Sequence, residues 1–348
     1  MPQMQEIFAE LTGSQYFSKF DLCKGYWQVP MSDKDKDLTT FITHRGLFRF
    51  NVMPFGLVNA PATFSRIMRK LLNELPKIHN YLDDVLSHDN SWTGQLAGLR
   101  RFLTRVRAAN LALKPSKCFI GYTDLVFLGH RLSSGRVAPT DNLLSKISHA
   151  SPPTTKKELR SFLGLVGYYR SFVPNFAAVA VPLTDLTKKG SPNVLVWGNA
   201  QQQAFCTLKQ CVCRPPVLRL PDLSKPFILQ TDPSCQGIGA ILLQEEDGIK
   251  HPVACASKKL LPRERNYSTI EREALAIVWG VRKFENYLLG THFYLETDHH
   301  PLQYLHQAKY QNSRIMRWAL LLQPYRFTVH AIKGTDNVGA DFLSRCLN

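Results

Sequence analysis

Two adjacent carboxylates, Asp83 and Asp84, occur in the stretch Tyr81-Leu82-Asp83-Asp84, with apolar residues on both sides. This pattern predicts two short strands joined by a tight turn. Two like charges a few ångströms apart repel each other. A divalent cation between them removes that cost, and oxygen ligands suit Mg²⁺. Taken alone, the pair is equally compatible with a solvated turn that binds no metal.

A third carboxylate, Asp21, ends a strand predicted over 16–22, about sixty residues before the pair. A carboxylate at a strand end and a pair at a hairpin can converge on one metal site. Two-metal phosphoryl transfer requires such a ligand set, because one ion activates the attacking oxygen and the other stabilises the leaving oxygen. The three acids therefore indicate metal-dependent phosphoryl transfer.

A second group of acids lies in the C-terminal third, where the order of elements predicts an RNase H fold. Three hairpin-like strands (227–231, 237–243 and 253–257) are followed by a helix (270–289), a strand (293–297), a helix (313–322), a strand (325–332) and a last helix (340–347). Four carboxylates fall at the ends of these elements or on the helices: Asp232, Glu273, Asp298 and Asp341. They could hold two Mg²⁺ ions that activate water and stabilise the leaving 3′-oxygen of an RNA phosphodiester.

The elements that position these acids group into three predicted domains, 1–135, 136–220 and 221–348. The first contains helices over 4–11, 62–72 and 94–109, and a loop at 48–61 that is punctuated by Pro54, Gly56 and Pro61. The second has helices over 143–150, from 155 onward and over 200–212, and an extended tether at 215–221. Thr155 and Glu158 have the spacing of a capping box.

Composition favours a nucleic-acid partner. The 348 residues carry 43 Lys+Arg against 27 Asp+Glu, a net charge of +16. A folded basic surface favours polyanions, nucleic acid first, and the alternative is that the charge serves solubility alone. There is no run of eighteen apolar residues and no signal peptide, so we expect no membrane span and an intracellular, cytoplasmic or nuclear location. The eight cysteines show no zinc-ligand spacing, and we expect free thiols.

Several motifs follow one another along the chain in a characteristic order. They are Phe17-Ser18-Lys19-Phe20-Asp21-Leu22, Val52-Met53-Pro54-Phe55-Gly56-Leu57, Asn59-Ala60-Pro61-Ala62-Thr63-Phe64, Tyr81-Leu82-Asp83-Asp84 and Phe127-Leu128-Gly129-His130. Together they resemble the reverse transcriptase of gypsy-type LTR retrotransposons. The stretches Glu158–Gly164 and Tyr168-Tyr169-Arg170 are similar to the thumb of that family.

The resemblance implies a right-hand polymerase palm with partial fingers, a thumb and an RNase H-like domain, an α+β and α/β multidomain protein. It implies that Asp21, Asp83 and Asp84 bind catalytic Mg²⁺, two ions per site, with Mn²⁺ as an alternative. Tyr26 matches the aromatic residue that excludes a ribose 2′-hydroxyl. Phe55 and Gly56 match the loop beneath the incoming nucleotide, and Leu128, Gly129 and His130 match the primer grip.

The motifs around Asp232, Glu273, Asp298 and Asp341 are similar to the RNase H of the same family. Glu273 is chosen over Glu271 because it precedes the apolar run Ala274-Leu275-Ala276-Ile277, as the ligand of the family precedes its apolar run; Glu271 is expected to be exposed. The implied partners are an RNA template, a DNA primer, the RNA–DNA hybrid and dNTPs, with the chain acting as a homodimer or within a larger Pol precursor.

In this family a further stretch before the first aspartate builds much of the fingers and supplies basic side chains that hold the triphosphate. The sequence begins twenty residues before Asp21, so we expect that stretch to be absent. Three functions stay open at this point. They are an RNA-directed DNA polymerase with RNase H activity, an RNase H alone, and a catalytically silent nucleic-acid-binding relic.

Overall fold

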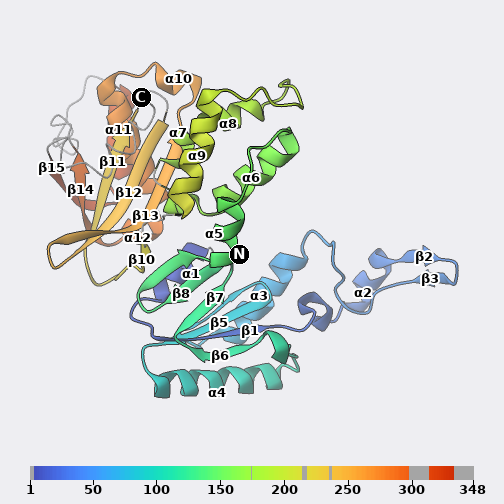
Figure 1. Ribbon diagram of the computed structural model, residues 1–348. Helices are drawn as coiled ribbons and strands as arrows, with labels where there is room; N and C mark the ends of the chain where they lie inside the picture. The colour runs from blue at the N-terminus through green and yellow to red at the C-terminus, as the bar shows by residue number, and fades with distance from the viewer. Residues whose placement is uncertain (1–3, 174, 214–217, 235–236, 298–312, 333–348) are drawn as a thin grey trace. The chain divides into compact units, whose positions relative to one another are not determined.

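The computed structural model describes residues 4–173, 175–213, 218–234, 237–297 and 313–332. The chain divides into two compact units, residues 1–137 and 138–348. The first division lies close to the predicted boundary after residue 135. The second predicted boundary, after residue 220, falls inside the second unit and stays a prediction. Both units combine helices with sheets, which confirms the predicted fold class (Figure 1).

The first unit is built on a four-stranded sheet in the order β4-β5-β1-β6. Its strands are β1 (Tyr16–Asp21), β4 (Ile78–Tyr81), β5 (Asp84–Asp89) and β6 (Phe119–Tyr122), and each paired neighbour is antiparallel. Side chains alternate between the two faces of a strand. Phe20 and Val85 are cross-strand partners on one face, and Asp21 and Asp84 are partners on the other. The register therefore separates the core side chains from the candidate ligands.

Two helices cover the core face of this sheet, α3 (Ala60–Leu72) and α4 (Trp92–Ala108). The cluster that they form with the sheet includes Phe20, Phe64 and Phe102, all almost fully buried. The ring of Phe20 lies 4.8 Å from that of Phe102, centre to centre. The start of α3 has Pro61 in its first turn, where the missing N–H costs nothing. Ser91 caps α4 by accepting a hydrogen bond from the Gly94 N–H.

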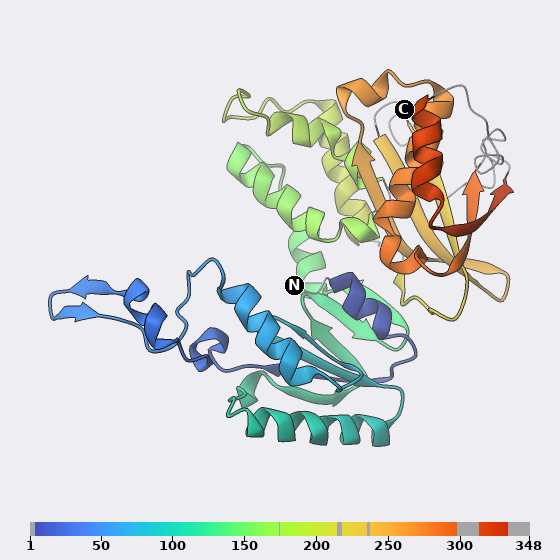
Figure 2. The same cartoon turned by 180° about the vertical axis from the view of Figure 1, so that it is seen from behind.

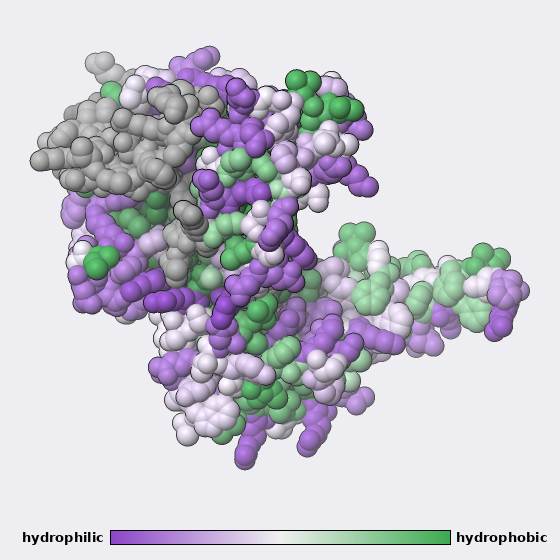
Figure 3. Space-filling model, in the orientation of Figure 1, coloured by the Kyte–Doolittle hydropathy of each residue, from purple (hydrophilic) through white to green (hydrophobic). Residues whose placement is uncertain are grey.

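Shorter elements complete the first unit. They are α1 (Met4–Glu10), η1 (Gly25–Gln28), α2 (Asp33–Lys36), η2 (Asp37–Thr39), β2 (Phe41–Thr43), β3 (Gly46–Phe48), η3 (Pro115–Lys117), β7 (Asp124–Phe127), β8 (His130–Ser133) and β9 (Arg136–Pro139). The β2–β3 hairpin projects away from the sheet in both views (Figures 1 and 2). It exposes apolar side chains such as Ile42 and Leu47, and Figure 3 shows green patches along this projecting segment.

The second unit begins with a group of helices that pack on α9 (Asn199–Cys213). The others are α5 (Asp141–Ser148), α6 (Lys156–Tyr168), η4 (Arg170–Phe172), α7 (Phe176–Val179) and α8 (Val181–Leu186). The predicted capping box at the start of α6 is confirmed, because Thr155 and Glu158 exchange both hydrogen bonds. The rings of Phe162 on α6 and Phe205 on α9 pack with their centres 4.6 Å apart and their planes tilted by 41°.

The rest of the second unit is a five-stranded mixed sheet in the order β13-β12-β11-β14-β15. Its strands are β11 (Phe227–Pro233), β12 (Gly237–Glu246), β13 (Ile249–Lys259), β14 (His292–Thr297) and β15 (Arg326–Ala331), and β10 (Leu218–Arg219) precedes them. The first three strands are antiparallel, and β14 and β15 pair in parallel. The helices are α10 (Pro262–Arg265), α11 (Thr269–Lys283), α12 (Glu285–Leu288) and α13 (Ser313–Leu322). The predicted strand order along the chain is confirmed as far as β15.

One predicted boundary was wrong. The single helix predicted over 270–289 is interrupted at Phe284, which has φ −106° and ψ 23° and separates α11 from α12. The turn between β12 and β13 consists of Asp247 and Gly248 alone, both with positive φ. Such two-residue turns match the twist of the strands that they join. The helix predicted over 340–347 lies outside the described residues, as do residues 215–217 of the predicted tether.

Helices in the described part of the chain are all too short or too polar to cross a lipid bilayer.

The packing of α4 on the sheet makes a direct stability prediction. Phe102→Ala removes a fully buried ring beside Phe20 and should lower the free energy of unfolding by about 3–5 kcal/mol. Leu103→Ala is the matched control. Leu103 is the next residue on α4 and its side chain is 43% exposed, so its replacement should change the free energy of unfolding by about 0.5 kcal/mol or less. Denaturant unfolding of both variants tests this, and equal losses would contradict the assigned helix face.

The close approach of α11 to β11 makes a second prediction. A Cβ added at Gly280 would lie 3.0 Å from Thr231 Cγ2 and 3.3 Å from Ala240 Cβ. Gly280→Ala should therefore lower the melting temperature, even though alanine favours helix. Thr231→Ser removes Cγ2, so the double variant should regain part of the loss. A melting temperature that Gly280→Ala leaves unchanged would show that the helix can move away without cost.

Candidate active sites

The first candidate site is formed where β1 and the β4–β5 hairpin meet. Asp21, at the end of β1, is the direct cross-strand partner of Asp84, the first residue of β5. Asp83 lies in the turn before Asp84, and its carbonyl accepts a hydrogen bond of 3.1 Å from the Leu22 N–H. The three acids predicted to act together are thus neighbours in the structure.

The hairpin turn holds a backbone conformation that the sequence did not indicate. Leu82 has a φ of +55°, in the left-handed region that side chains with a Cβ avoid. A turn with positive φ at its first central position ordinarily has glycine there. Strain of this kind persists only where the surrounding structure enforces it. Here the pairing of Tyr81 with Asp84 closes the turn and places Asp83 at its tip.

The electrostatics show that the acids interact. Burial raises the pKa of the Asp83 carboxyl, and the neighbouring charges of Asp84 and Asp21 raise it further. Burial and the charge of Asp83 in turn raise the pKa of Tyr26. Two lysines offset the negative charge: Lys117 Nζ lies 3.0 Å from Asp21 Oδ2, and Lys19 Nζ lies 3.0 Å from Asp84 Oδ1.

These residues fit a divalent cation by their chemistry. They offer hard carboxylate oxygens, and their mutual repulsion is what a cation relieves. Gly25 leaves room for this arrangement, since a Cβ there would lie 3.0 Å from Asp83 Cγ. Within the described ranges, however, no three Asp, Glu, His or Cys side chains already form a metal cage. Each lysine contacts one oxygen of its carboxylate, so a cation would compete with Lys117 for Asp21 and with Lys19 for Asp84.

Sequence reasoning missed the lysines and Gly25. Lys19 could have been found, because it lies two residues before Asp21 and so shares its face of the strand. Lys117 could not, because only the folding of η3 beside β1 brings it to Asp21, 96 residues away in the chain.

The residues predicted to contact the nucleotide differ in how closely they pack and how far they are exposed. Tyr26 packs its ring 5.4 Å from both Phe55 and Phe64. Phe55 is 59% exposed, and Gly56 has a φ of +95° with open space around it. The structure thus leaves Phe55 and Gly56 accessible to a ligand.

The predicted primer-grip residues form the turn between β7 and β8. Leu128 and Gly129 both have positive φ, and Gly129 is exposed. His130 is buried instead: its Nδ1 lies 2.9 Å from the Leu128 carbonyl, and its ring packs edge-on against Phe8 at 5.1 Å. His130 therefore packs beneath the turn, and contact of Leu128, Gly129 and His130 with a primer strand stays a prediction.

The second candidate site involves β11 and α11. Asp232 lies near the end of β11, paired with Gly239, and Glu273 lies on α11, which packs on β11. One oxygen of each carboxylate, Asp232 Oδ2 and Glu273 Oε2, is fully buried. Asp298 and Asp341 lie outside the described residues, so the four-acid site stays a prediction.

Glu271 has a different role from the one expected. It is not exposed: its side chain accepts hydrogen bonds from the Ser268 N–H and hydroxyl, which caps α11, and it forms an ion pair with Arg314 at 2.7 Å. These contacts occupy Glu271 at the start of the helix. Glu273 lies further along α11 and is buried.

Comparison with protein families places both sites in known domains. Residues 1–132 match the family "Reverse transcriptase (RNA-dependent DNA polymerase)", and residues 222–325 match "RNase H-like domain found in reverse transcriptase". The fold is similar to that of the foamy viral protease-reverse transcriptase in complex with double-stranded DNA. The TM-score is 0.84 at 23% identity, over 96% of this chain and 60% of that one. A second structure, of that protein in complex with an RNA/DNA hybrid, matches with a TM-score of 0.82 at 23% identity, over 95% of this chain and 46% of that one.

Curated relatives match along nearly the whole chain. The Pol polyprotein from transposon 297 of Drosophila melanogaster is 40% identical over 99% of this chain and 32% of its own length. That from transposon 412 of the same species is 37% identical over 99% and 28%. The Tf2-3 polyprotein of Schizosaccharomyces pombe is 34% identical over 100% and 26%. The chain thus spans about a third or less of these relatives, and it belongs to the reverse transcriptases with an RNase H-like domain of gypsy-type LTR retrotransposon Pol polyproteins.

Proposed function

We propose that this chain copies an RNA template into DNA and hydrolyses the RNA strand of the resulting hybrid, as part of a retrotransposon Pol polyprotein. The observation that carries the proposal is the register of β1 against β5, which sets Asp21 opposite Asp84 with Asp83 at the adjoining turn. Three mutually repelling acids side by side at one end of a sheet, on the face opposite α3 and α4, are a poor choice for stability. They are well suited to binding cations at a reaction centre.

For polymerisation, Asp21, Asp83 and Asp84 would hold Mg²⁺, with Mn²⁺ as an alternative. The bound ions would activate the primer 3′-hydroxyl and stabilise the leaving pyrophosphate. The protein itself supplies position. Gly25 packs against the Asp83 carboxylate. Lys19 holds Asp84 and Lys117 holds Asp21 in place until a bound cation displaces the lysines.

The nucleotide and primer would bind beside these acids. The Tyr26 ring, near enough to Asp83 for that charge to raise its pKa, would exclude a ribose 2′-hydroxyl. Phe55 and Gly56 would lie beneath the incoming dNTP, and Leu128 and Gly129 would contact the primer strand. The net charge of +16 favours the phosphate backbones of template, primer and hybrid.

For hybrid cleavage, Asp232, Glu273, Asp298 and Asp341 would hold the ions that activate water. Selectivity for a hybrid over double-stranded DNA would come from contacts to 2′-hydroxyls on one strand. These substrates imply a place of action inside the cell, in cytoplasm or nucleus, with the chain working as a homodimer or within a longer Pol precursor.

Separation of the two activities tests the proposal. A primed RNA template labelled on both strands is incubated with Mg²⁺ and dNTPs, and extension and RNA cleavage are read on one gel. Asp83→Asn should abolish extension and leave cleavage intact, and Asp232→Asn should do the reverse. Extension that persists in Asp83→Asn would remove the polymerase assignment, and cleavage that persists in Asp232→Asn would remove the nuclease assignment.

The same Asp83→Asn variant should be more stable than the original protein at neutral pH. Burial and two neighbouring carboxylates raise the pKa of Asp83 in the folded state, so its ionised form is destabilising above that pKa. A neutral amide removes this repulsion, and the melting temperature should rise. A stabilised but inactive variant would show that lost extension does not come from unfolding. A lower melting temperature would contradict the electrostatic account.

Gly25→Ala tests the positioning of Asp83 without removing a charge. The added Cβ would lie 3.0 Å from Asp83 Cγ and 3.1 Å from Oδ2, so the carboxylate must shift. Since a misplacement of about 1 Å can cost about a hundredfold in rate, we expect a large loss of kcat for extension. Gly98→Ala on α4 is the control, because its nearest neighbour would be Ser87 Oγ at 3.9 Å. Equal extension by the two variants would contradict the proposed packing.

A further inference from the structure

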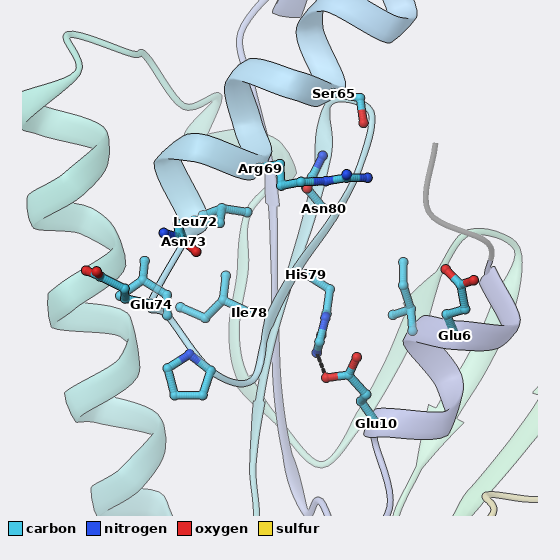
Figure 4. A pocket seen from close by; sticks show the side chains of 13 residues that line it. Glu6, Glu10, Ser65, Arg69, Leu72, Asn73, Glu74, Ile78, His79 and Asn80 are labelled. Carbon is cyan, nitrogen blue, oxygen red and sulfur yellow. Dashed lines mark ion pairs between the residues drawn. The ribbon is translucent and has the colours of Figure 1, made fainter. Parts of the chain in front are cut away.

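A chain of four polar side chains lies at the base of the hairpin that carries Asp83 and Asp84. Ser14 Oγ is 2.7 Å from His88 Nδ1, His88 Nε2 is 3.0 Å from His79 Nε2, and Glu10 Oε2 is 3.5 Å from His79 Nε2. Ser14 and His88 are each only 3% exposed. Figure 4 shows His79 pointing from β4 toward Glu10 on α1, at a cavity of about 480 Å³ between α1, α3 and β4.

The two imidazoles meet edge to edge. Their planes are 16° apart and their centres are 5.1 Å apart, whereas their Nε2 atoms are only 3.0 Å apart. The distance between the ring centres exceeds the distance between the Nε2 atoms by almost two ring radii. Both Nε2 atoms therefore lie close to the line that joins the two centres, and they face one another nearly in the ring planes. Two lone pairs aimed at each other suit one shared proton. They do not suit a common metal ion, which needs lone pairs that converge on a third point.

The contact crosses the hairpin diagonally. In the β4–β5 register His79 pairs with Leu86, and His88 is two residues further along β5 on the same face. Asp84 lies on that face as well, because it is two residues before Leu86. A slip of one residue in this register would move Asp84 to the opposite face of the sheet. The same one-residue slip would place His79 and His88 on opposite faces and break the bond between them.

We infer that Ser14, His88 and His79, which are linked by hydrogen bonds, and Glu10, whose carboxylate lies 3.5 Å from the same His79 nitrogen, form a polar relay. This relay fixes the register of the β4–β5 hairpin against α1 and so positions Asp83 and Asp84 for polymerisation. None of the four touches the reacting atoms; they are positioning residues. The inference rests on the proposed polymerase function. It also predicts that the polymerase unit loses stability in mild acid, since the relay requires exactly one proton between the two rings.

The protonation chemistry gives the sign of this dependence. Burial, His79 and Lys77 lower the pKa of His88 from 6.5 to about 3, against the opposing effect of Asp89. Burial also lowers the pKa of His79, and Glu10 partly opposes it. The unfolded chain therefore takes up protons first as pH falls. Stability from the neutral pair is complete above about pH 6.5 and declines as pH falls toward the folded values.

Other charged groups surround the pair without joining the relay. Lys77 lies just before β4 and pairs with Asp89 on β5 at 3.0 Å. Arg101 of α4 lines a small cavity with His88, and Arg69 of α3 and Glu6 of α1 line the larger cavity with His79. Of these groups, Lys77 lowers and Asp89 raises the pKa of His88, so both are left unchanged in the variants that test the relay.

The first test compares the two activities in His88→Phe, which keeps a ring of similar size and removes both nitrogens. We expect kcat for extension to fall about ten- to hundredfold, with KM for dNTP and hybrid cleavage unchanged. Cleavage by the second unit shows in the same sample that the chain is intact. Unchanged kcat in a folded His88→Phe protein would overturn the inference.

The second test follows the melting temperature of the full chain between about pH 7 and pH 5. His88→Phe should give a flatter acid decline than the original protein. Glu10→Gln should give a steeper one, because loss of the carboxylate lowers the pKa of His79 further. Glu6→Gln, on the same helix and cavity, should follow the original protein. Equal slopes for Glu10→Gln and Glu6→Gln would overturn the inference, even if His88→Phe fails to fold.

The two proposals fail in different ways. If the original protein extends no primer, the polymerase function is wrong, while the order of acid slopes still reports on the relay. If the original protein extends primers and a folded His88→Phe protein extends them equally fast, the relay has no positioning role and the function stands.

Discussion

The antiparallel pairing of β1 with β5 is the constraint on which the first unit depends. Because side chains alternate along a strand, this single register sends Phe20 and Val85 into the core and Asp21 and Asp84 to the other face. Hydrophobic burial on one face thus holds together like charges on the other. The repulsion raises the pKa of Asp83, and the strained φ of Leu82 persists, because the buried face is strong enough to tolerate both.

The second unit uses helix packing in a similar way. Gly280 lets α11 approach β11 so closely that a Cβ would touch Thr231, the residue before Asp232. The same helix carries Glu273, and a capping box at Ser268 and Glu271 fixes where it begins. The distance between helix and strand is therefore set by the absence of one methyl group, and the acids of the two elements are held at that distance.

Both units hold charged side chains in buried or crowded positions, which costs stability. In each unit a nearby side chain of opposite charge offsets part of that cost. Lys19 and Lys117 neutralise Asp84 and Asp21, and Lys250 pairs with the buried Glu296 at 2.6 Å. The His79–His88 hydrogen bond satisfies polar groups that the fold buries, and Glu10 on α1 lies 3.5 Å from His79. Such paired groups specify one register, since a shifted strand would leave them buried without partners.

The sequence by itself determined the family, the order of the described elements, and the acids Asp21, Asp83, Asp84, Asp232 and Glu273 as candidates, because motifs and periodicity are local properties of the chain. It also determined the capping box at Thr155. Only the tertiary structure decided what depends on contacts between distant segments: Lys117 beside Asp21, Gly25 against Asp83, the burial of His130, and the relay from Ser14 to Glu10. The break at Phe284 was also decided there, because the apolar pattern continues through it and only the backbone angles of the packed chain interrupt the helix.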